Sequence, residues 1–507
     1  MRRIGSKPQF VRNISSNLIV LAVSSVVMLW FTPYLIGQLG LAVYGLVPLA
    51  LSLSTYMGIL TIGIQAAVGR YLTLEVAKED HDAASRVMST ALSANLLIAL
   101  GVMPLLLGVA AAAPSLFNVP PGHESDARWF FMLAMLSYVC VAIREVTGAA
   151  SFASNRIDLQ NVARLTDTLV RVGFVVIVFS TRGPDLRLVG VGMLVGALAS
   201  VFIAVFAWGF SAPEIHYAFK YFERDRLRAM LGTGGWVTVN HIGSLLHMAT
   251  DLVVINIILG SAVAGAYGSV LQLSTFLRSL AGALAIVLAP VLFAQYAQER
   301  TQALGVTAAR AVKLLGMAIG LPTALVMGFG RPVLTLWLGP AFTPLVPVLL
   351  VMTVHLTYNY AFLPLDTVSM AYDRVKWPSI VGVVTGVINV GLSIVFAHYG
   401  SWAIGVAFAT LVSLTARYGV FTPLYAAHVT GSAKTRFFAS AAFGVGLSLL
   451  FGAAALALDR AVGITTWSGL VLASAGVSIA YLLAAIALLS SDDRSLLCSL
   501  IPGVKRA

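Results

Sequence analysis

Long apolar segments alternate with short polar loops along almost the whole chain. A helix needs about 20 predominantly apolar residues to cross the hydrocarbon core of a bilayer, and the pattern predicts fourteen such spans. They lie near residues 14–36, 43–69, 87–111, 129–152, 161–180, 188–211, 229–258, 264–293, 309–331, 344–370, 379–398, 402–425, 437–457 and 467–489. We therefore expect an all-α polytopic membrane protein with about 14 transmembrane helices.

The composition agrees with this pattern. Of the 507 residues, 59% are hydrophobic and only 10% are charged, and the mean hydropathy is +0.91. Soluble domains carry about 25% charged residues. A chain with so few charges cannot cover a water-exposed surface, which excludes soluble enzymes and secreted disulfide scaffolds.

The distribution of positive charge predicts the orientation of the chain. The formal net charge is +12, and most of the 32 Lys and Arg residues fall in loops on one side of the predicted membrane. The positive-inside rule assigns that side, with both termini, to the cytoplasm. The charge is therefore a topology signal, and we expect no nucleic-acid partner.

A short repeat predicts two lobes. Residues 37–47 and 260–270 share Gly, Tyr-Gly and Val at a constant offset, each in an outer hairpin between an odd and an even span. The number of spans between the copies is even, so the repeat is parallel. We expect a six-helix lobe at 1–211, a cytoplasmic linker at 212–228, a second six-helix lobe at 229–425, and two further helices with a cytoplasmic tail at 426–507. Apolar residues at helical spacing in the linker favour an interfacial amphipathic helix over an ordinary charged loop.

Charged residues inside the spans are candidate functional groups, because a charge in hydrocarbon is unfavourable by several kcal/mol. The five predicted cations are all Arg, whose planar fork of donors suits phosphate oxygens and which stays charged when desolvated. They are Arg278, Arg171, Arg144, Arg417 and Arg164. An Arg-lined cavity of this kind would bind a diphosphate group.

A structural interpretation of some of these charges stays open. Arg164, Asp167 and Arg171 share one helix face, so that Asp167 can neutralise either neighbour. Arg144 and Glu145 are adjacent and point about 100° apart, so we expect them not to face each other. Asp251 is either a proton or cation coupling site or a structural partner for an Arg.

The remaining polar residues give weaker signals. His355, Tyr358, Asn359 and Tyr360 would either contact sugars or hydrogen-bond neighbouring helices. His241 and His247 lie on different helix faces, and no Cys/His cluster suggests a metal. We expect no cofactor apart from a coupling proton or cation.

Several short motifs resemble the polysaccharide transporter family, the Wzx-type flippases of the multidrug/oligosaccharidyl-lipid/polysaccharide exporter superfamily. The resemblance covers nearly the whole chain. It is carried by Asn13–Asn17, Trp30–Gly37, Tyr44-Gly45, Gly63, Gly69-Arg70, Asp251, Leu259-Gly260, Tyr267 and the loop Leu336–Phe342.

The resemblance implies a transport function, and three alternative functions stay open beside it. It implies alternating access between two lobes in the bacterial inner membrane, moving undecaprenyl-diphosphate-linked oligosaccharide, an O-antigen or exopolysaccharide repeat unit, from the inner to the outer leaflet. The implied partners are this glycolipid, membrane lipid, and polymerase or export proteins of the same pathway. A lipid II flippase and a cation-coupled multidrug antiporter are alternatives. A polytopic glycan polymerase or glycosyltransferase is disfavoured because the outer loops are short.

Overall fold

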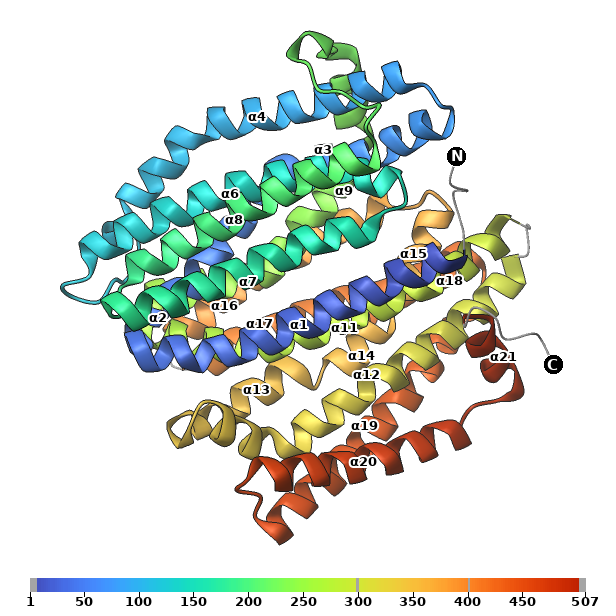
Figure 1. Cartoon of the computed structure of the whole chain (residues 1–507). Helices are drawn as coiled ribbons and strands as arrows, with labels where there is room; N and C mark the ends of the chain where they lie inside the picture. Colours follow the sequence, from blue (N-terminus) through green and yellow to red (C-terminus); the bar gives the residue numbers. More distant parts are fainter. Residues whose placement is uncertain (1–6, 298–300, 400–401, 501–507) are drawn as a thin grey trace. The chain divides into compact units, whose positions relative to one another are not determined.

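The protein is all-helical across the part of the chain described by the computed structural model, residues 7–297, 301–399 and 402–500 (Figure 1). The N-terminal helices are α1 (Lys7–Leu39), α2 (Leu41–Tyr44), α3 (Leu46–Ala77), α4 (His81–Ala111), α5 (Ala113–Leu116), α6 (Glu124–Ala153), α7 (Ile157–Arg182), α8 (Leu186–Ser211), η1 (Phe219–Tyr221), α9 (Arg224–Met248) and α10 (Thr250–Leu259). The C-terminal helices are α11 (Ser261–Ala297), α12 (Thr301–Trp337), η2 (Pro340–Leu345), α13 (Val346–Thr353), α14 (Leu356–Ala361), α15 (Pro364–Ala371), α16 (Lys376–His398), α17 (Trp402–Leu414), η3 (Thr415–Phe421), α18 (Thr422–Thr430), α19 (Lys434–Val462), α20 (Trp467–Ala487) and α21 (Ser491–Leu500).

The chain divides into two compact units. Unit 1 runs to Leu245 and includes Leu252–Gly265, and unit 2 comprises Leu246–Asp251 and the chain from Ala266 onward. The predicted lobe limits at residues 211 and 229, and the parallel repeat, stay predictions.

The all-α membrane class is confirmed, but the count of 14 spans is not. In the described part of the chain, 12 helices are long and apolar enough to cross a membrane, or up to 13 if the bent pair Leu41–Tyr56 and Thr61–Ala77 is one span. The span expected at 161–180 corresponds to α7, which contains Arg164, Asp167 and Arg171 and is not among the 12. These charges lower the mean hydropathy of α7. The helix is therefore present at the expected place but is not among the helices apolar enough to cross a membrane.

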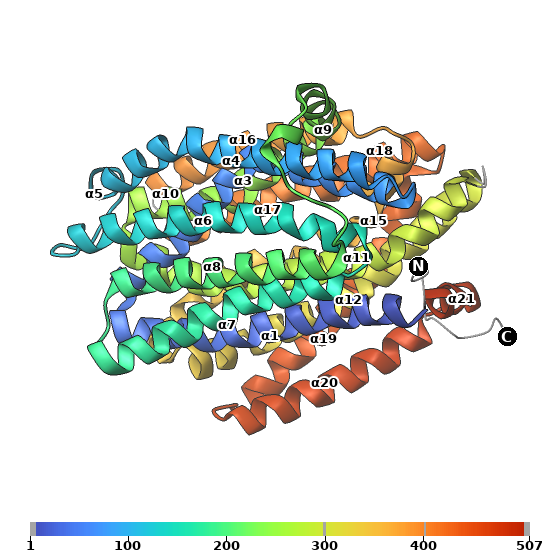
Figure 2. The same ribbon diagram turned by 45° about the horizontal axis from the view of Figure 1, so that its top comes forward.

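Unit 1 is built around α6, which packs against α3, α4 and α8, while α7 lies between α8 and α1 (Figures 1 and 2). A glycine allows the close approach of α7 and α8. A Cβ atom on Gly196 would lie 2.6 Å from the carbonyl oxygen of Asp167. Only a residue without a side chain therefore fits at this crossing.

The start of α1 is hydrogen-bonded to the turn between α6 and α7 and to the beginning of α7. The Asn13 amide donates to the Asn155 side-chain oxygen at 2.9 Å. The Asn161 amide donates to Ser16 Oγ at 2.9 Å and to Asn17 Oδ1 at 2.7 Å. The polar residues at the entry to the first span thus fix the position of α1 within unit 1.

Unit 2 is organised by the contact of α12 with α19, and α20 packs beside both (Figure 1). Glycines line this contact. A Cβ on Gly328 would lie 2.1 Å from the Cβ of Ala455, and one on Gly444 would lie 2.3 Å from the carbonyl carbon of Gly316. The Tyr481 hydroxyl on α20 donates to the Met317 carbonyl at 2.7 Å, which fixes α20 on α12.

The linker at 212–228 does not form the predicted amphipathic helix. After α8 the chain is irregular apart from the single turn η1, and α9 begins at Arg224. Ala212 and Ile215 are buried, and the segment lies along α4 (Figure 1). The apolar positions that suggested a helix therefore include residues that pack the segment onto unit 1.

Hydroxyl side chains on α4 replace the hydrogen bonds that a helical linker would make. Ser85 Oγ accepts from the backbone N–H of His216, Ser89 Oγ accepts from that of Ala218, and Thr90 Oγ1 accepts from that of Glu223, all at 3.0–3.1 Å. Glu223 also pairs with Arg86 at 2.8 Å, and the hydrogen bond from Arg86 is the main reason that the pKa of Glu223 lies below its usual value.

The two copies of the sequence repeat have different local conformations. Gly260 separates α10 from α11 with φ +94°, whereas its sequence match Gly37 lies inside α1. The corresponding helix break near the first copy is at Gly40, with φ +75°. The tyrosines agree better, because Tyr44 and Tyr267 are both almost fully buried.

Candidate functional site

A partly buried network of charges joins α6 and α7 in unit 1. Arg144 Nη1 donates to Asp167 Oδ2 at 3.0 Å, and Arg144 Nη2 donates to Glu145 Oε1 at 2.8 Å. Arg164 Nη2 donates to the other oxygen of Glu145 at 2.9 Å. Two carboxylates are therefore bonded to two guanidinium groups, and Arg144, which contacts both carboxylates, is the centre of the network.

This network corrects one sequence-based expectation and adds an ion-pair partner to another. Arg144 and Glu145 do pair, because the long Arg side chain bends back toward its neighbour even though their Cβ atoms point apart. Asp167 pairs with Arg144 on another helix rather than forming an ion pair with Arg164 or Arg171 on its own helix. Arg171 is half-buried, its Nε has no hydrogen-bond partner in the described part of the chain, and it interacts electrostatically with Asp167.

A cavity of about 740 Å³ lies beside this network, within unit 1. Its lining residues include Arg70, Arg164 and Glu145, together with polar and aromatic residues. The lining residues that the structure describes are Gln65, Gly69, Arg70, Thr73, Leu74, Glu145, Ala149, Phe152, Gln160 and Arg164. The cavity is formed by the ends of α3 and α6 and the start of α7.

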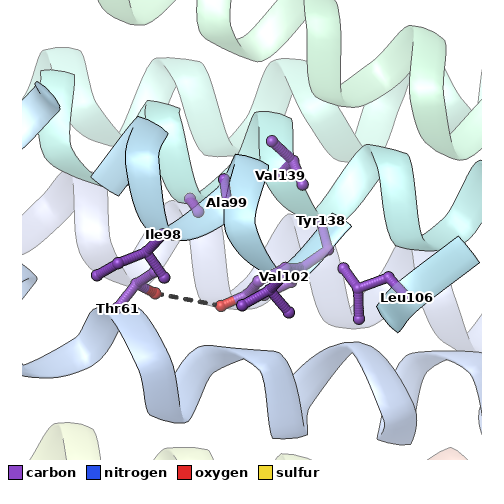
Figure 3. Close-up of a pocket in the computed structure, with 8 residues that line it drawn as sticks. Thr61, Ile98, Ala99, Val102, Leu106, Tyr138 and Val139 are labelled. Carbon is purple, nitrogen blue, oxygen red and sulfur yellow. Dashed lines mark hydrogen bonds between the residues drawn. The ribbon is translucent and has the colours of Figure 1, made fainter. Parts of the chain in front are cut away.

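A chain of hydrogen bonds leads from this cavity into an apolar pocket. Gln65 Nε2 donates to Thr61 Oγ1 at 3.1 Å, and Thr61 Oγ1 lies 3.4 Å from the Tyr138 hydroxyl. Figure 3 shows Tyr138 pointing toward Thr61 beneath the apolar side chains of α4. The pocket has a volume of about 20 Å³, which is enough for one water molecule.

Asp251 is the centre of a buried polar cluster in unit 2. Its Oδ2 accepts from the Tyr267 hydroxyl and from Thr410 Oγ1, both at 2.8 Å. Its Oδ1 accepts from Asn389 Nδ2 at 3.4 Å. Ser413 Oγ donates to Asn389 Oδ1 at 3.1 Å. The side chain of Asp251 is 3% exposed, and no ion pair holds it among the residues that the structure describes.

Arg278 is close to this cluster but is not paired with it. It is 7% exposed, and the structure gives its guanidinium no hydrogen bond or ion pair within residues 7–297, 301–399 and 402–500. It is near enough to interact electrostatically with Asp251 and His355. Unit 2 therefore contains a buried cation whose donor groups are not used by described residues.

The span that carries the expected sugar contacts is broken into short helices. It consists of α13, α14 and α15, and His355 lies at the first break. The Asn359 amide lies 3.0 Å from His355 Nδ1 and donates to Thr415 Oγ1 at 3.0 Å, while the Tyr358 hydroxyl donates to the Gly419 carbonyl at 2.9 Å. These side chains make internal hydrogen bonds, and their contact with sugars stays a prediction.

Arg417 lies in a π-helical segment, η3, opposite this broken span. Its guanidinium is over the ring of Tyr418 at 4.7 Å and packs against Gly382. The residue is 5% exposed and interacts electrostatically with Asp366. Tyr360 is also near Tyr418, with ring centroids 5.8 Å apart. π-helical turns are frequent at functional sites.

The predicted arginines thus fall into two groups, Arg144, Arg164 and Arg171 in unit 1, and Arg278 and Arg417 in unit 2. Sequence reasoning did not identify Gln65, Gln160 and Phe152, which line the cavity, or Asn389 and Thr410, which bind Asp251. Amides inside predicted apolar spans were the available signal for Gln65 and Asn389.

Comparison with solved structures identifies the fold. The fold matches that of the lipid II flippase MurJ in an inward closed conformation, with a TM-score of 0.69 over 94% of this chain and 99% of that one, at 15% identity. It also matches an inward-facing multidrug resistance MATE family transporter of the MOP superfamily, with a TM-score of 0.65 over 83% of this chain and 99% of that one, also at 15% identity. The chain therefore shares the fold of these two membrane proteins.

Sequence comparison defines the family. The family model described as polysaccharide biosynthesis protein matches residues 10–296, and the chain belongs to this family. It is 28% identical to the uncharacterized membrane protein EpsK of Bacillus subtilis (strain 168) over 96% of both chains. It is 20% identical to a putative O-antigen transporter of Shigella flexneri over 50% of this chain and 59% of that one. The resemblance drawn from the sequence motifs is confirmed.

Proposed function

We propose that the protein is a flippase that moves an oligosaccharide linked to a polyprenyl diphosphate from the inner to the outer leaflet of the bacterial cytoplasmic membrane. Both termini are cytoplasmic in this proposal, and the glycan is a repeat unit of O-antigen or exopolysaccharide. The family membership and the transporter fold support it. Polymerase and export proteins of the same pathway are its proposed partners.

The proposal depends mainly on one observation, the burial of Arg278 without an ion pair among the described residues. A buried guanidinium with no ion pair in the described residues is unfavourable unless a ligand neutralises it during the functional cycle. A diphosphate supplies several anionic oxygens in the geometry that a guanidinium prefers. The remaining arginines, Arg144, Arg164, Arg171 and Arg417, would stabilise the charge at other stages of the passage.

The proposal fits the physical difficulty of the transport step. A diphosphate and several sugars cannot enter hydrocarbon unaided, because each charged or polar group would lose its water partners. The polyprenyl tail can stay in lipid throughout. Alternating access then requires only that the polar part be bound in a protein-lined space that is open to one side at a time.

Native mass spectrometry of the protein extracted gently from its host tests this function. We expect an adduct with the mass of a polyprenyl diphosphate glycan, lost in Arg278→Ala and retained in Arg331→Ala, whose side chain is exposed in the same unit. Arg278→Lys should retain part of the binding, because it keeps the charge but not the fork of donors. A lipid II adduct would assign the protein to peptidoglycan synthesis, and adducts retained in Arg278→Ala would contradict the assigned role of Arg278.

A cation-coupled mode is supported by Asp251. Its carboxylate is held by hydroxyl and amide donors and by no ion pair among the described residues, which suits a site where a proton or small cation binds transiently. We expect Asp251→Asn to retain the glycolipid adduct but to abolish any dependence of transport on a proton or sodium gradient in vesicles. Gradient-dependent transport by Asp251→Asn would leave Asp251 with a structural role.

A further inference from the structure

The cavity of unit 1 has lining groups that suit neutral hydroxyl groups better than phosphate. Glu145 is one of the lining residues, and its carboxylate accepts hydrogen bonds from Arg164 and Arg144 at 2.9 and 2.8 Å. Its negative charge opposes a diphosphate placed beside it. This one carboxylate offsets one of the two positive charges in the lining, those of Arg70 and Arg164, so the lining combines charged groups without being strongly cationic.

The amides and the aromatic ring supply the complementary chemistry. The Gln160 amide lines the cavity and makes no hydrogen bond to any residue that the structure describes, which leaves two donors and an acceptor for a ligand. Thr73 and Gln65 add further polar atoms. Phe152 is 45% exposed and offers an apolar surface to the C–H groups of a sugar ring. A mixture of donors, acceptors and one aromatic side chain matches a ligand rich in hydroxyl groups.

The size of the cavity agrees with such a ligand. Its volume of about 740 Å³ falls in the range of about 300–1,000 Å³ that is typical of small-molecule sites. The described lining residues all belong to unit 1, whereas Arg278, the proposed diphosphate contact, belongs to unit 2.

We propose that the unit 1 cavity is an oligosaccharide subsite, in which Gln160, Glu145 and Gln65 hydrogen-bond sugar hydroxyl groups and Phe152 packs against a sugar ring. The inference rests on the proposed flippase function and extends it. The protein recognises two chemically different parts of one substrate, the diphosphate through Arg278 and the glycan through this cavity. Specificity for the glycan then depends on unit 1.

Two probes distinguish these parts in the full-length protein reconstituted in lipid nanodiscs. The first is the lipid-free repeat-unit oligosaccharide released by partial hydrolysis of the polysaccharide of the producing strain. The second is undecaprenyl diphosphate without any sugar. Binding of each probe is measured for the wild type, for the cavity variants Gln160→Leu and Phe152→Leu, and for Arg278→Ala. The matched controls are Thr181→Val on α7 and Phe206→Leu on α8, which are exposed outside the cavity.

We expect each cavity variant to weaken oligosaccharide binding about fivefold to tenfold, as the loss of one or two hydrogen bonds or one ring contact predicts. Binding of undecaprenyl diphosphate should be unchanged in these variants and weakened in Arg278→Ala. Melting temperatures within a degree or two of the wild type would show that the variants are folded.

Two results would overturn the inference. Oligosaccharide binding that is unchanged in both cavity variants would remove the subsite, while retained binding of undecaprenyl diphosphate would leave the flippase function standing. Failure of the wild type to bind either probe would contradict the proposed function itself and the subsite with it.

Discussion

The guanidinium of Arg144 on α6 and the carboxylate of Asp167 on α7 are 3.0 Å apart and largely buried within unit 1. We expect Asp167→Asn to destabilise the protein by about 1–3 kcal/mol, because a hydrogen bond to a charged, poorly solvated group is lost. Arg144 keeps its second partner, Glu145, which limits the effect. The measurement is thermal unfolding in detergent.

Two further variants complete this test. Thr166→Val, one residue away, removes only a hydroxyl bonded to a backbone carbonyl and should melt like the wild type. The double variant Arg144→Met/Asp167→Leu should recover part of the lost stability, because well-packed apolar residues often replace a buried ion pair without loss. An Asp167→Asn protein as stable as the wild type would contradict the importance of the pair.

The contact of α12 with α19 predicts opposite results for two glycines on one helix. A Cβ on Gly444 would lie 2.3 Å from the carbonyl carbon of Gly316, whereas a Cβ on Gly446 would meet nothing within 4 Å. We expect Gly444→Ala to lower stability by about 1–3 kcal/mol or more through overpacking. Gly446→Ala should be neutral or raise stability by up to about 1 kcal/mol, because Ala favours the helix. Equal melting temperatures for the two variants would contradict the close approach.

The C-terminal helix α21 is tied to α12 by a buried ion pair. Lys313 Nζ lies 2.7 Å from Asp493 Oδ2 and also donates to the Leu488 carbonyl at 2.8 Å. Asp493→Asn should speed hydrogen exchange of the α21 amides at neutral pH. Asp492→Asn is the matched control, because the Asp492 side chain is 62% exposed and pairs with Arg310, and exposed pairs contribute little. Equal exchange in the two variants would argue against a buried anchor.

The same ion pair predicts a pH dependence. Burial acts to raise the pKa of Asp493, but the hydrogen bonds from Lys313 and Ser490 and the charge of Lys313 outweigh it, so that the pKa lies below its usual value. A carboxylate with a lowered pKa stabilises the folded state above its unfolded pKa, about 3.9. We expect the docking of α21 to be independent of pH near neutrality and to weaken as the pH falls below about 4. Hydrogen exchange corrected for its intrinsic pH dependence measures this, and a transition near pH 6 would contradict it.

The segment between α8 and α9 should be loosened by removing one hydroxyl from α4. Ser89 Oγ accepts from the Ala218 N–H at 3.1 Å. We expect Ser89→Ala to speed exchange of the Ala218 amide about fivefold, as the loss of about 1 kcal/mol predicts. Ser115→Ala, whose hydroxyl bonds only a nearby carbonyl, should have no effect on this amide. Unchanged exchange in Ser89→Ala would contradict a contribution of this hydrogen bond, because the bonds to Ser85 and Thr90 remain in the variant.

The sequence predicted the helices and the family well, because spans of about 20 apolar residues leave little choice of structure in a bilayer. The count differed at α7, where the charges that suggested a functional site also reduced the apolar signal. The linker was predicted wrongly because the hydroxyl groups that bind its backbone belong to α4, more than a hundred residues earlier in the chain. The periodicity of apolar residues within the linker cannot predict a hydrogen-bond partner so distant in the sequence.

The sequence predicted several residues of the candidate site, but it did not predict which residues contact one another. Asp251 was identified as a buried charge, but two of its partners, Asn389 and Thr410, are distant in sequence, and no spacing rule links them. Arg144 and Glu145 were expected to point apart, yet the flexible Arg side chain overcomes the 100° between their Cβ directions. The direction of a Cβ restricts short side chains more strongly than long ones.

The π-helical segment Thr415–Phe421 joins α17 to α18 and changes the direction in which the side chains of α18 point relative to those of α17. Its hydrogen bonds run from residue i to i+5 instead of i+4, and each additional residue in a helix rotates everything after it by about 100°. Before the segment, Thr410 and Ser413 donate hydrogen bonds to Asn389 in the polar cluster around Asp251. After it, Ala426 packs into an apolar cluster instead. Deleting one residue from the segment would rotate α18 by about 100° relative to α17. Either the side chains around Asp251 or the apolar side chains of α18 would then no longer face their partners.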